Sequence, residues 1–139
     1  YGMADARIGM LYANEEIVHY MNVIKLPYNI NQHTQSLAIE ALDKIETKNN
    51  FVQELIQGRK YLVNELAQIS FIKKIYPSDA NYILFKVEDA NHLYRYLIQH
   101  KIIVRNRTTA PLLTGCLRVS VGTKNENEKF IEILKKYKS

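Results

Sequence analysis

Arginine side chains near the C-terminal end of the sequence have the pattern best suited to chemistry. Arg118 stands in residues 116–122, a run with the period-2 alternation of a strand, which sends it to the face opposite its apolar neighbours. Arg105 ends another predicted strand, residues 102–105, with Arg107 on the same side. Two guanidinium groups on paired strands repel each other unless an anion lies between them, and each can grip a carboxylate or phosphate with two hydrogen bonds. The pattern predicts an anion clamp; surface arginines paired with local acids, which are scarce here, remain the alternative.

Other candidate residues give weaker signals. Arg7 opens a predicted strand over residues 7–13, two positions after Asp5, and a local ion pair is the simplest interpretation of the sequence alone. The single Cys116 excludes an internal disulfide and a cysteine-ligated zinc site, and in a strand its thiol is expected to be inert. The histidines form no metal-binding or nucleophilic motif, so no metal site is expected. They are His19, His33, His92 and His100.

Composition sets the class of protein. The 139 residues are 47% hydrophobic and 24% charged, which is the balance of one domain that can bury a core. The positive charge is concentrated in residues 89–139, with ten lysines and arginines against four acids, whereas residues 1–88 carry nine against ten. This bias fits an anionic partner or a solvated basic face equally well. No apolar run is long enough for a membrane span, and the single cysteine fits a reducing cytosol.

The expected elements give an α+β fold, three helices followed by a small β-β-α-β-β-α lobe. Asn14 is predicted to cap the first helix, which Pro27 ends, and Thr123 with Glu126 forms a capping box for the last one. A polar break is expected at residues 46–50, before a long helix. The four strands of the lobe are expected at residues 72–76, 82–87, 102–105 and 116–121, with a helix capped by Asp89 between the second and third.

Four short segments of the sequence, taken together and in order, resemble a known protein family, although no single segment is specific for it. Tyr-Gly-Met-Ala-Asp-Ala-Arg-Ile-Gly (1–9) resembles the segment after the cofactor lysine in fold-type I pyridoxal-phosphate aminotransferases. Residues 78–82, 103–107 and 116–123 are similar to C-terminal signatures of the histidinol-phosphate aminotransferase family; the strings are Ser-Asp-Ala-Asn-Tyr, Ile-Val-Arg-Asn-Arg and Cys-Leu-Arg-Val-Ser-Val-Gly-Thr. Within the second string, Asn81 is expected to stabilise a turn. The similarity is collinear along the whole chain.

The resemblance implies a C-terminal part of such an enzyme, within a larger α/β transferase. Residues 1–47 would end the large cofactor-binding domain, 48–70 would form the interdomain helix and 71–139 the small domain. The Schiff-base lysine would lie two residues before Tyr1, so this chain contains no catalytic residue and is expected to be inactive alone. The absence of an initiator Met fits a piece of a longer chain.

The resemblance also assigns ligands. Arg7 would bind the phosphate of pyridoxal 5'-phosphate, and Arg105 and Arg118 would hold the anionic end of the substrate. The implied reaction is ping-pong transamination between histidinol phosphate and 2-oxoglutarate, giving imidazole acetol phosphate and glutamate, in histidine biosynthesis. The family implies a cytoplasmic homodimer with no membrane or nucleic-acid partner.

Two alternatives remain. One is a sister enzyme on the same fold, an aromatic aminotransferase or a threonine-phosphate decarboxylase, because much of substrate choice would depend on upstream residues. The other is a basic module that binds nucleic acid with an affinity that falls steeply with salt. No run of lysine and arginine exceeds two residues, which speaks against the second alternative.

Overall fold

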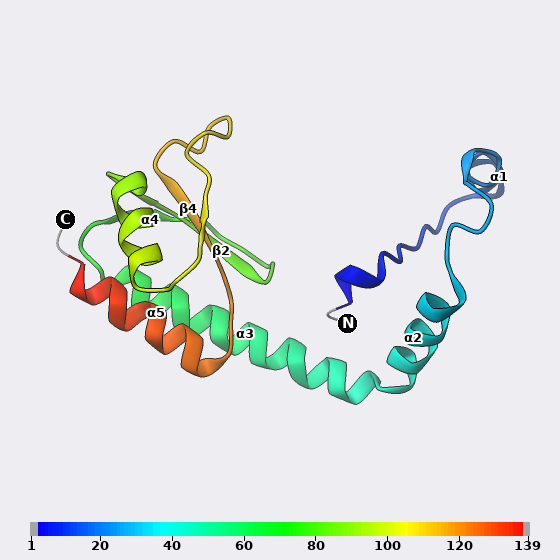
Figure 1. The fold of residues 1–139 in the computed structure, drawn as a ribbon, viewed down its shortest axis with the longest axis horizontal. Helices are drawn as coiled ribbons and strands as arrows, with labels where there is room; N and C mark the ends of the chain where they lie inside the picture. Colours follow the sequence, from blue (N-terminus) through cyan, green and yellow to red (C-terminus); the bar gives the residue numbers. More distant parts are fainter. Residues whose placement is uncertain (1–2, 138–139) are drawn as a thin grey trace. The chain divides into compact units, whose positions relative to one another are not determined.

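The computed structural model describes residues 3–137, and its contacts divide the chain into two units, Tyr1–Asn50 and Phe51–Ser139. The boundary falls within the long helix α3 (Figure 1). The helices are a 3-10 turn η1 (Ala4–Ala6), α1 (Glu15–Ile24), α2 (Gln32–Asp43), α3 (Ile45–Ala67), α4 (Ala90–Gln99) and α5 (Lys124–Lys136). The strands are β1 (Ile72–Ile75), β2 (Tyr82–Val87), β3 (Arg105–Asn106) and β4 (Cys116–Ser120). The expected α+β class and the order of the lobe are confirmed.

The segment predicted as the first strand is not a strand. Residues 7–13 have no regular secondary structure, and their large side chains are exposed, Met10 by 77% and Tyr12 by 87%. A strand needs a neighbour to satisfy its N–H and C=O groups, and the described part of the N-terminal unit contains no strand to pair with. The prediction of residues 7–13 as a strand is therefore wrong for this chain.

Helices α1 and α2 begin where local capping signals place them. The Asn14 side chain accepts a hydrogen bond from the Ile17 backbone N–H at 3.0 Å, as expected, and Asn31 accepts one from Thr34 at 2.8 Å. Helix α1 ends at Ile24, just before Pro27. Neither helix buries a residue among those described, so capping, and not a core, defines their ends.

The polar break expected at residues 46–50 is also wrong. Helix α3 starts at Ile45 and runs through these residues, and only Lys44 separates it from α2. The five residues include no glycine or proline, and Glu46 lies in the first turn, where the helix dipole favours an acid. Polarity alone does not end a helix that solvent surrounds. Farther along, Leu62 and Leu66 are fully buried in the C-terminal unit.

The C-terminal unit is built on an antiparallel sheet with the order β1-β2-β4-β3. Residue 118 of β4 lies opposite Leu84 of β2 and opposite Arg105 of β3. The strand predicted at residues 102–105 starts later than expected, because the Ile102 N–H bonds to the Leu97 carbonyl at 2.9 Å and closes the end of α4. Only Arg105 and Asn106 remain to pair with β4.

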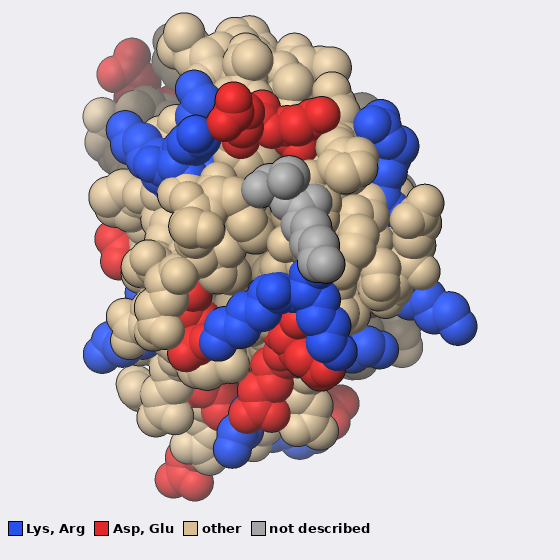
Figure 2. Space-filling model, turned by 90° about the vertical axis from the view of Figure 1, so that its left-hand side faces the viewer, with Lys and Arg blue, Asp and Glu red and all other residues tan. Residues whose placement is uncertain are grey.

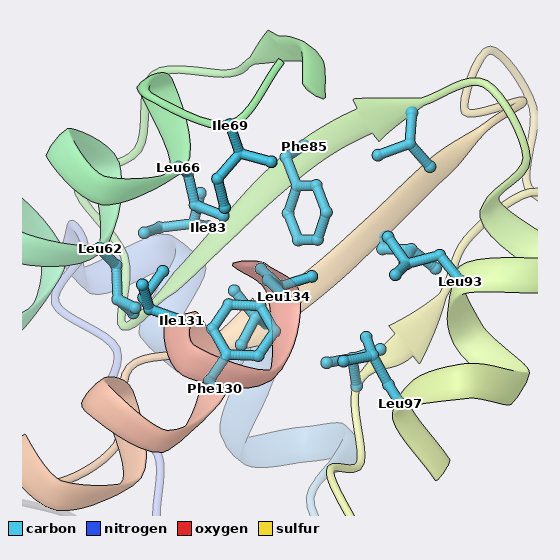
Figure 3. Close-up of a cluster of buried hydrophobic side chains, with 14 of the residues drawn as sticks. Leu62, Leu66, Ile69, Ile83, Phe85, Leu93, Leu97, Phe130, Ile131 and Leu134 are labelled. Carbon is cyan, nitrogen blue, oxygen red and sulfur yellow. The ribbon is translucent and has the colours of Figure 1, made fainter. Parts of the chain in front are cut away.

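One face of this sheet carries the hydrophobic core (Figure 3). Ile83, Phe85 and Leu117 are completely buried on that face. Side chains from all three helices of the unit pack with them, and the Phe85 and Phe130 rings lie 6.5 Å apart. The helix residues include Leu62 and Leu66 of α3, Leu93 and Leu97 of α4, and Ile131 and Leu134 of α5. The core fixes the strands and so the opposite face, which carries the arginines.

Candidate anion-binding site

Two arginines meet on the face of the sheet opposite the core. Arg105 and Arg118 are direct cross-strand partners in β3 and β4, so the structure places the two predicted clamp residues together. Arg105 is exposed and Arg118 is half-buried. Neither makes an ion pair with any described residue, and the four strands contain no Asp or Glu. Like charges directly opposite each other destabilise a sheet, so this pair lacks the counter-charge that an anion would supply.

The surroundings of Arg118 leave its hydrogen-bonding capacity unused. Its Nε atom is buried and has no hydrogen-bond partner among the described residues. Its Cζ atom lies 4.9 Å from the ring centroid of Tyr82, which pairs with Ser120 on the same face of the sheet. A buried, unsatisfied donor on a charged group is costly, and such groups call for an explanation. A bound carboxylate or phosphate would provide one.

A second row of cations flanks the arginine pair. Lys74 and Lys86 are cross-strand partners in β1 and β2, and Lys86 is in turn opposite Cys116. Lys74 Nζ lies 4.7 Å from the Tyr76 ring centroid, and the Arg107 N–H donates to the Cys116 carbonyl at 3.0 Å. This face of the sheet is therefore positive over two adjacent rows, which raises the local concentration of small anions.

Some basic residues elsewhere in the last third are paired with acids. Lys135 bonds to Glu65 at 2.6 Å, and Lys136 bonds to Glu132 one helical turn before it at 2.5 Å. Figure 2 looks onto one face of the molecule, on which basic and acidic side chains lie side by side. This mixed face does not offer the continuous basic stripe of a nucleic-acid interface.

Asn127 holds the end of β4 and was not singled out from the sequence. Its Nδ2 donates to the Gly122 carbonyl and its Oδ1 accepts from the Gly122 N–H, both at 3.0 Å. The side chain is only 4% exposed. An asparagine in a helix gives no local signal of this role, because the bonded peptide lies before the helix, and only the folded loop shows it.

The capping box predicted at the start of α5 is confirmed. The Thr123 hydroxyl accepts from the Glu126 N–H, and Glu126 Oε2 accepts from the Thr123 N–H at 2.8 Å. Hydrogen bonds from the Thr123 backbone and then from its hydroxyl lower the pKa of the Glu126 carboxyl. The box begins α5 directly after β4 and so fixes where the Arg118 strand ends.

The turn before β2 is stabilised by a side chain from helix α3. Arg59 of α3 donates to the Ala80 carbonyl at 2.8 Å and lies 3.7 Å from the Asp79 carboxylate. Within the turn, Ser78 Oγ donates to the Tyr82 carbonyl at 2.6 Å and accepts from the Ala80 N–H at 3.2 Å. Within the turn itself, the side-chain bonds come from Ser78. Asn81 contributes its backbone carbonyl, which accepts from the Val121 N–H and extends the β2–β4 pairing, so its expected turn-stabilising role stays a prediction.

Arg7 belongs to the N-terminal unit. It caps η1 in the left-handed conformation, with φ of 55°, and its guanidinium donates to the Ala4 carbonyl at 3.3 Å. The local ion pair with Asp5 is not formed in the described residues. Three other non-glycine residues among those described share this backbone conformation, so it does not by itself mark a functional site. Arg7 therefore presents an exposed cation without an acid partner.

The histidines have structural roles where contacts are described. His92 Nδ1 lies 2.6 Å from the Tyr137 hydroxyl, and His100 Nδ1 lies 2.8 Å from the Tyr96 carbonyl. Burial raises the pKa of Tyr137. Within residues 3–137, no three His, Cys, Asp or Glu side chains gather where they could hold a metal ion. None of the helices described is both long and apolar enough to span a membrane.

The fold is of the α+β class, and the sheet face opposite the core carries a candidate site for a small anion. Residues 1–134 match the aminotransferase class I and II family. The chain belongs to that family.

Relatives with curated names make the likeness more specific. The chain is 52% identical over 135 residues to the histidinol-phosphate aminotransferase of Flavobacterium psychrophilum, covering 97% of this chain and 39% of the relative. The crystal structure of the histidinol-phosphate aminotransferase from Clostridium acetobutylicum matches with a TM-score of 0.80 and 27% identity, over 88% of this chain and 37% of that one. L-threonine-O-3-phosphate decarboxylase from Porphyromonas gingivalis shares the fold, with a TM-score of 0.75 and 20% identity, over 97% of this chain and 42% of that one. The chain thus spans about two fifths of the length of these proteins.

Proposed function

We propose that this chain is the C-terminal part of a histidinol-phosphate:2-oxoglutarate aminotransferase that depends on pyridoxal 5'-phosphate. The observation that carries the proposal is the Arg105–Arg118 pair, two facing cations without an acid partner among the described residues. The relatives named histidinol-phosphate aminotransferase support the choice of reaction. Both substrates of that reaction carry an anionic group, a phosphate in one half-reaction and a carboxylate in the other.

The residues present fit the proposed cofactor at one point. Arg7 is exposed, makes one side-chain hydrogen bond and no ion pair among the described residues, and so keeps donors for a phosphate group. When bound, pyridoxal phosphate would supply the electron sink for cleavage of the substrate's α C–H bond and the acceptor for its amino group. Arg7 would retain the cofactor through its phosphate.

Arg105 and Arg118 would bind and orient the substrate. A guanidinium can donate two parallel hydrogen bonds to a carboxylate or to two oxygens of a phosphate, so one pair serves glutamate or 2-oxoglutarate and histidinol phosphate or imidazole acetol phosphate alternately. Holding this end fixes the amino or keto carbon relative to the reacting groups and lowers the entropic part of the barrier. The substrate anion also relieves the repulsion between the two arginines.

The remaining parts of the proposal concern the complete protein. The lysine that forms a Schiff base would lie upstream, so this chain alone would not turn over substrate. Residues 1–47 would complete a large domain, 48–70 would connect the domains, and 71–139 would form the small domain. We propose a homodimer in the reducing cytosol, where the free, buried Cys116 would stay a thiol.

Kinetics of the complete protein that contains this chain test the proposal. Arg118→Ala is expected to cost about 2–5 kcal/mol in kcat/KM for both substrates, the scale of a buried charge pair that loses one member. The cofactor's visible absorption should stay unchanged in this variant, whereas Arg7→Ala should weaken cofactor retention. Arg95→Ala, which removes an exposed arginine of α4, serves as the matched control.

Two results would overturn the proposal. An unchanged kcat/KM of Arg118→Ala with both substrates would show that Arg118 does not bind the substrate anion. Turnover of phenylalanine or decarboxylation of threonine phosphate by the complete protein, without turnover of histidinol phosphate, would assign it to a sister enzyme on the same fold.

A further inference from the structure

We propose that Tyr82 is a positioning residue that orients the Arg118 guanidinium for a two-point grip on the substrate's anionic group. This inference rests on the proposed function, because it assigns a task to a neighbour of the proposed clamp. It concerns how Arg118 is held before the anion arrives.

The sheet register brings the two side chains together. Tyr82 pairs with Ser120 across β2 and β4, while Arg118 pairs with Leu84, so the tyrosine and the arginine are diagonal neighbours on one face. The Arg118 Cζ atom lies 4.9 Å from the Tyr82 ring centroid, within the range in which a ring face attracts a cation. Tyr82 is 37% exposed, so its ring lies at the border between the sheet and solvent.

Arg118 needs such a support because nothing else in the described chain fixes it. Its Nε has no hydrogen-bond partner, it makes no ion pair with a described residue, and the facing Arg105 repels it. Packing around the buried Nε restricts the side chain, but without a hydrogen bond or ion pair the guanidinium keeps some rotational freedom, and ordering it on binding would cost entropy. Contact with the Tyr82 ring reduces that cost before the anion binds.

A ring suits this task better than a carboxylate would. An acid beside Arg118 would neutralise its charge and occupy the N–H groups that the substrate needs. A ring contacts the face of the planar guanidinium and leaves the N–H groups free, because they point outward in its plane. The aromatic contact therefore orders the cation while it keeps full charge and donors for the ligand.

The neighbouring row of the sheet supplies a matched comparison. Lys74 lies over the Tyr76 ring at 4.7 Å, so the same kind of contact occurs where no arginine pair is present. A lysine ammonium is compact and cannot present two parallel donors in a fixed plane. Loss of the Tyr76 ring should therefore leave anion binding at Arg118 unchanged, which makes Tyr76→Leu the control for Tyr82→Leu.

The first test uses the 139-residue chain and inorganic phosphate. Contact with a ring should shift the Arg118 side-chain NMR signals upfield through the ring current, and Tyr82→Leu should abolish this shift. The same variant should weaken phosphate binding at the Arg118 Nε–H signal about fivefold, the scale of one cation–π contact. Tyr82→Phe, which keeps the ring, should restore both the shift and the binding.

The second test separates KM from kcat in the complete protein. Tyr82→Leu should raise KM for the phosphate and carboxylate substrates by about fivefold and change kcat by less than about twofold. The reason is that the ring helps Arg118 to bind the substrate equally in the ground state and in the transition state. Tyr82→Phe should return KM to within about twofold of the original value. Tyr76→Leu should leave both constants unchanged.

The outcomes distinguish this inference from the proposed function. If Arg118→Ala leaves phosphate binding unchanged, measured by titration calorimetry because this variant lacks the Arg118 signal, the anion clamp itself is wrong. If Arg118→Ala abolishes binding while Tyr82→Leu leaves it unchanged, the clamp stands and the role of Tyr82 is overturned. If Tyr82→Leu does not fold, the NMR spectrum of the unsubstituted chain tests the role of Tyr82. Arg118 side-chain chemical shifts at their ordinary values would then exclude the contact with the ring.

Discussion

The two units of this chain form helices equally well but differ in what those helices bury. Every buried hydrophobic residue described lies in the C-terminal unit, from Leu62 onward. In the N-terminal unit, Leu11 is 53% exposed, Ile24 73% and Tyr28 fully. Helices α1 and α2 have good caps and no core, which shows that local signals can define a helix while only non-local packing gives it a partner. Exposed apolar faces of this extent are typical of surfaces that another part of a protein covers.

Removal of a large core side chain is the strongest way to test this difference. Phe85→Ala should lower the free energy of unfolding of the C-terminal unit by about 3–5 kcal/mol, since the ring is completely buried beneath three helices. Tyr12→Ala, in the N-terminal unit, should change it by less than about 0.5 kcal/mol, because that side chain is 87% exposed. Urea unfolding followed by circular dichroism measures both, with Phe85→Leu as a milder variant if Phe85→Ala does not fold.

An equal loss from both substitutions would mean that Tyr12 has partners in solution and that the contrast between the units is wrong. Native-state hydrogen exchange gives an independent check. Amides of β2 and β4 should exchange only through unfolding of the unit, whereas those of α1 should exchange by local opening.

Loss of the two Asn127 hydrogen bonds to Gly122 should lower the free energy of unfolding by the next largest amount. Asn127→Leu keeps the size of the side chain but leaves both the N–H and the carbonyl of Gly122 without their bonds in a nearly buried site. We expect the C-terminal unit to lose about 2–3 kcal/mol, the cost of unsatisfied buried groups. The matched control is Asn125→Ala, an exposed asparagine of the same helix, for which thermal unfolding should show almost no change.

The Asn127 hydrogen bonds also affect the proposed anion site, because they hold Gly122, which lies two residues beyond the end of β4 at Ser120. Asn127→Leu should therefore broaden the Arg118 side-chain NMR signals as well as lower the stability. Sharp, unshifted Arg118 signals in this variant would show that the end of β4 does not control the arginine.

Equivalent caps in the two units should have unequal consequences. Thr123→Ala removes the capping box of α5 and should cost the C-terminal unit about 1 kcal/mol. Asn14→Ala removes the cap of α1, which buries nothing, and should reduce helical circular dichroism without moving the unfolding midpoint of the C-terminal unit. A shift of that midpoint by Asn14→Ala would show that the two units unfold together.

The sequence predicted features that depend on neighbours along the chain. The caps at Asn14, Asp89 and Thr123 and the bounds of β2 follow from short-range signals, and all are present. The cross-strand position of Arg105 and Arg118 follows from alternation and strand order. The caps need only neighbours along the chain, and the arginine pair needs only the pairing of two successive strands.

Features that depend on distant contacts could not be predicted. Residues 7–13 have the composition of a strand, yet the described part of the N-terminal unit offers no strand to pair with. Residues 102–104 do not pair with β4, because the Ile102 N–H bonds to the end of α4 instead. The bond from Arg59 to Ala80 spans 21 positions, and the contact of Tyr82 with Arg118 spans a whole hairpin and helix. No local pattern encodes such pairs, because many surface arginines and tyrosines have the same neighbours in sequence.

The smallest expected effect concerns two carboxylates whose pKa is lowered for different reasons. In the N-terminal unit, the hydrogen bond from Lys44, aided by its charge, lowers the pKa of Glu40. In the C-terminal unit, the uncharged N–H and hydroxyl of Thr123 lower the pKa of Glu126. Salt screens an exposed ion pair more than a hydrogen bond between a carboxylate and an uncharged donor. An NMR pH titration at high salt should therefore move the Glu40 midpoint back towards its ordinary value and leave that of Glu126 low.

The sign of the stability effect follows from linkage. A carboxyl with a lower pKa in the folded than in the unfolded chain stabilises the fold above the ordinary glutamate value of about 4.3, and this contribution is lost as the pH falls through the folded-state pKa. Both carboxyl groups are exposed, so each contributes little to the free energy of unfolding. Only Glu126 lies in a helix that packs against the hydrophobic core, so only its contribution should affect the stability of the C-terminal unit. Thr123→Ala removes the hydroxyl but keeps the backbone N–H, which is the larger cause, so the pKa of Glu126 should rise only part of the way towards the ordinary value. The loss of stability of the C-terminal unit at acid pH should become slightly less steep. Lys44→Ala should return the Glu40 midpoint without changing that curve, and a change of the curve by Lys44→Ala would contradict the energetic separation of the two units.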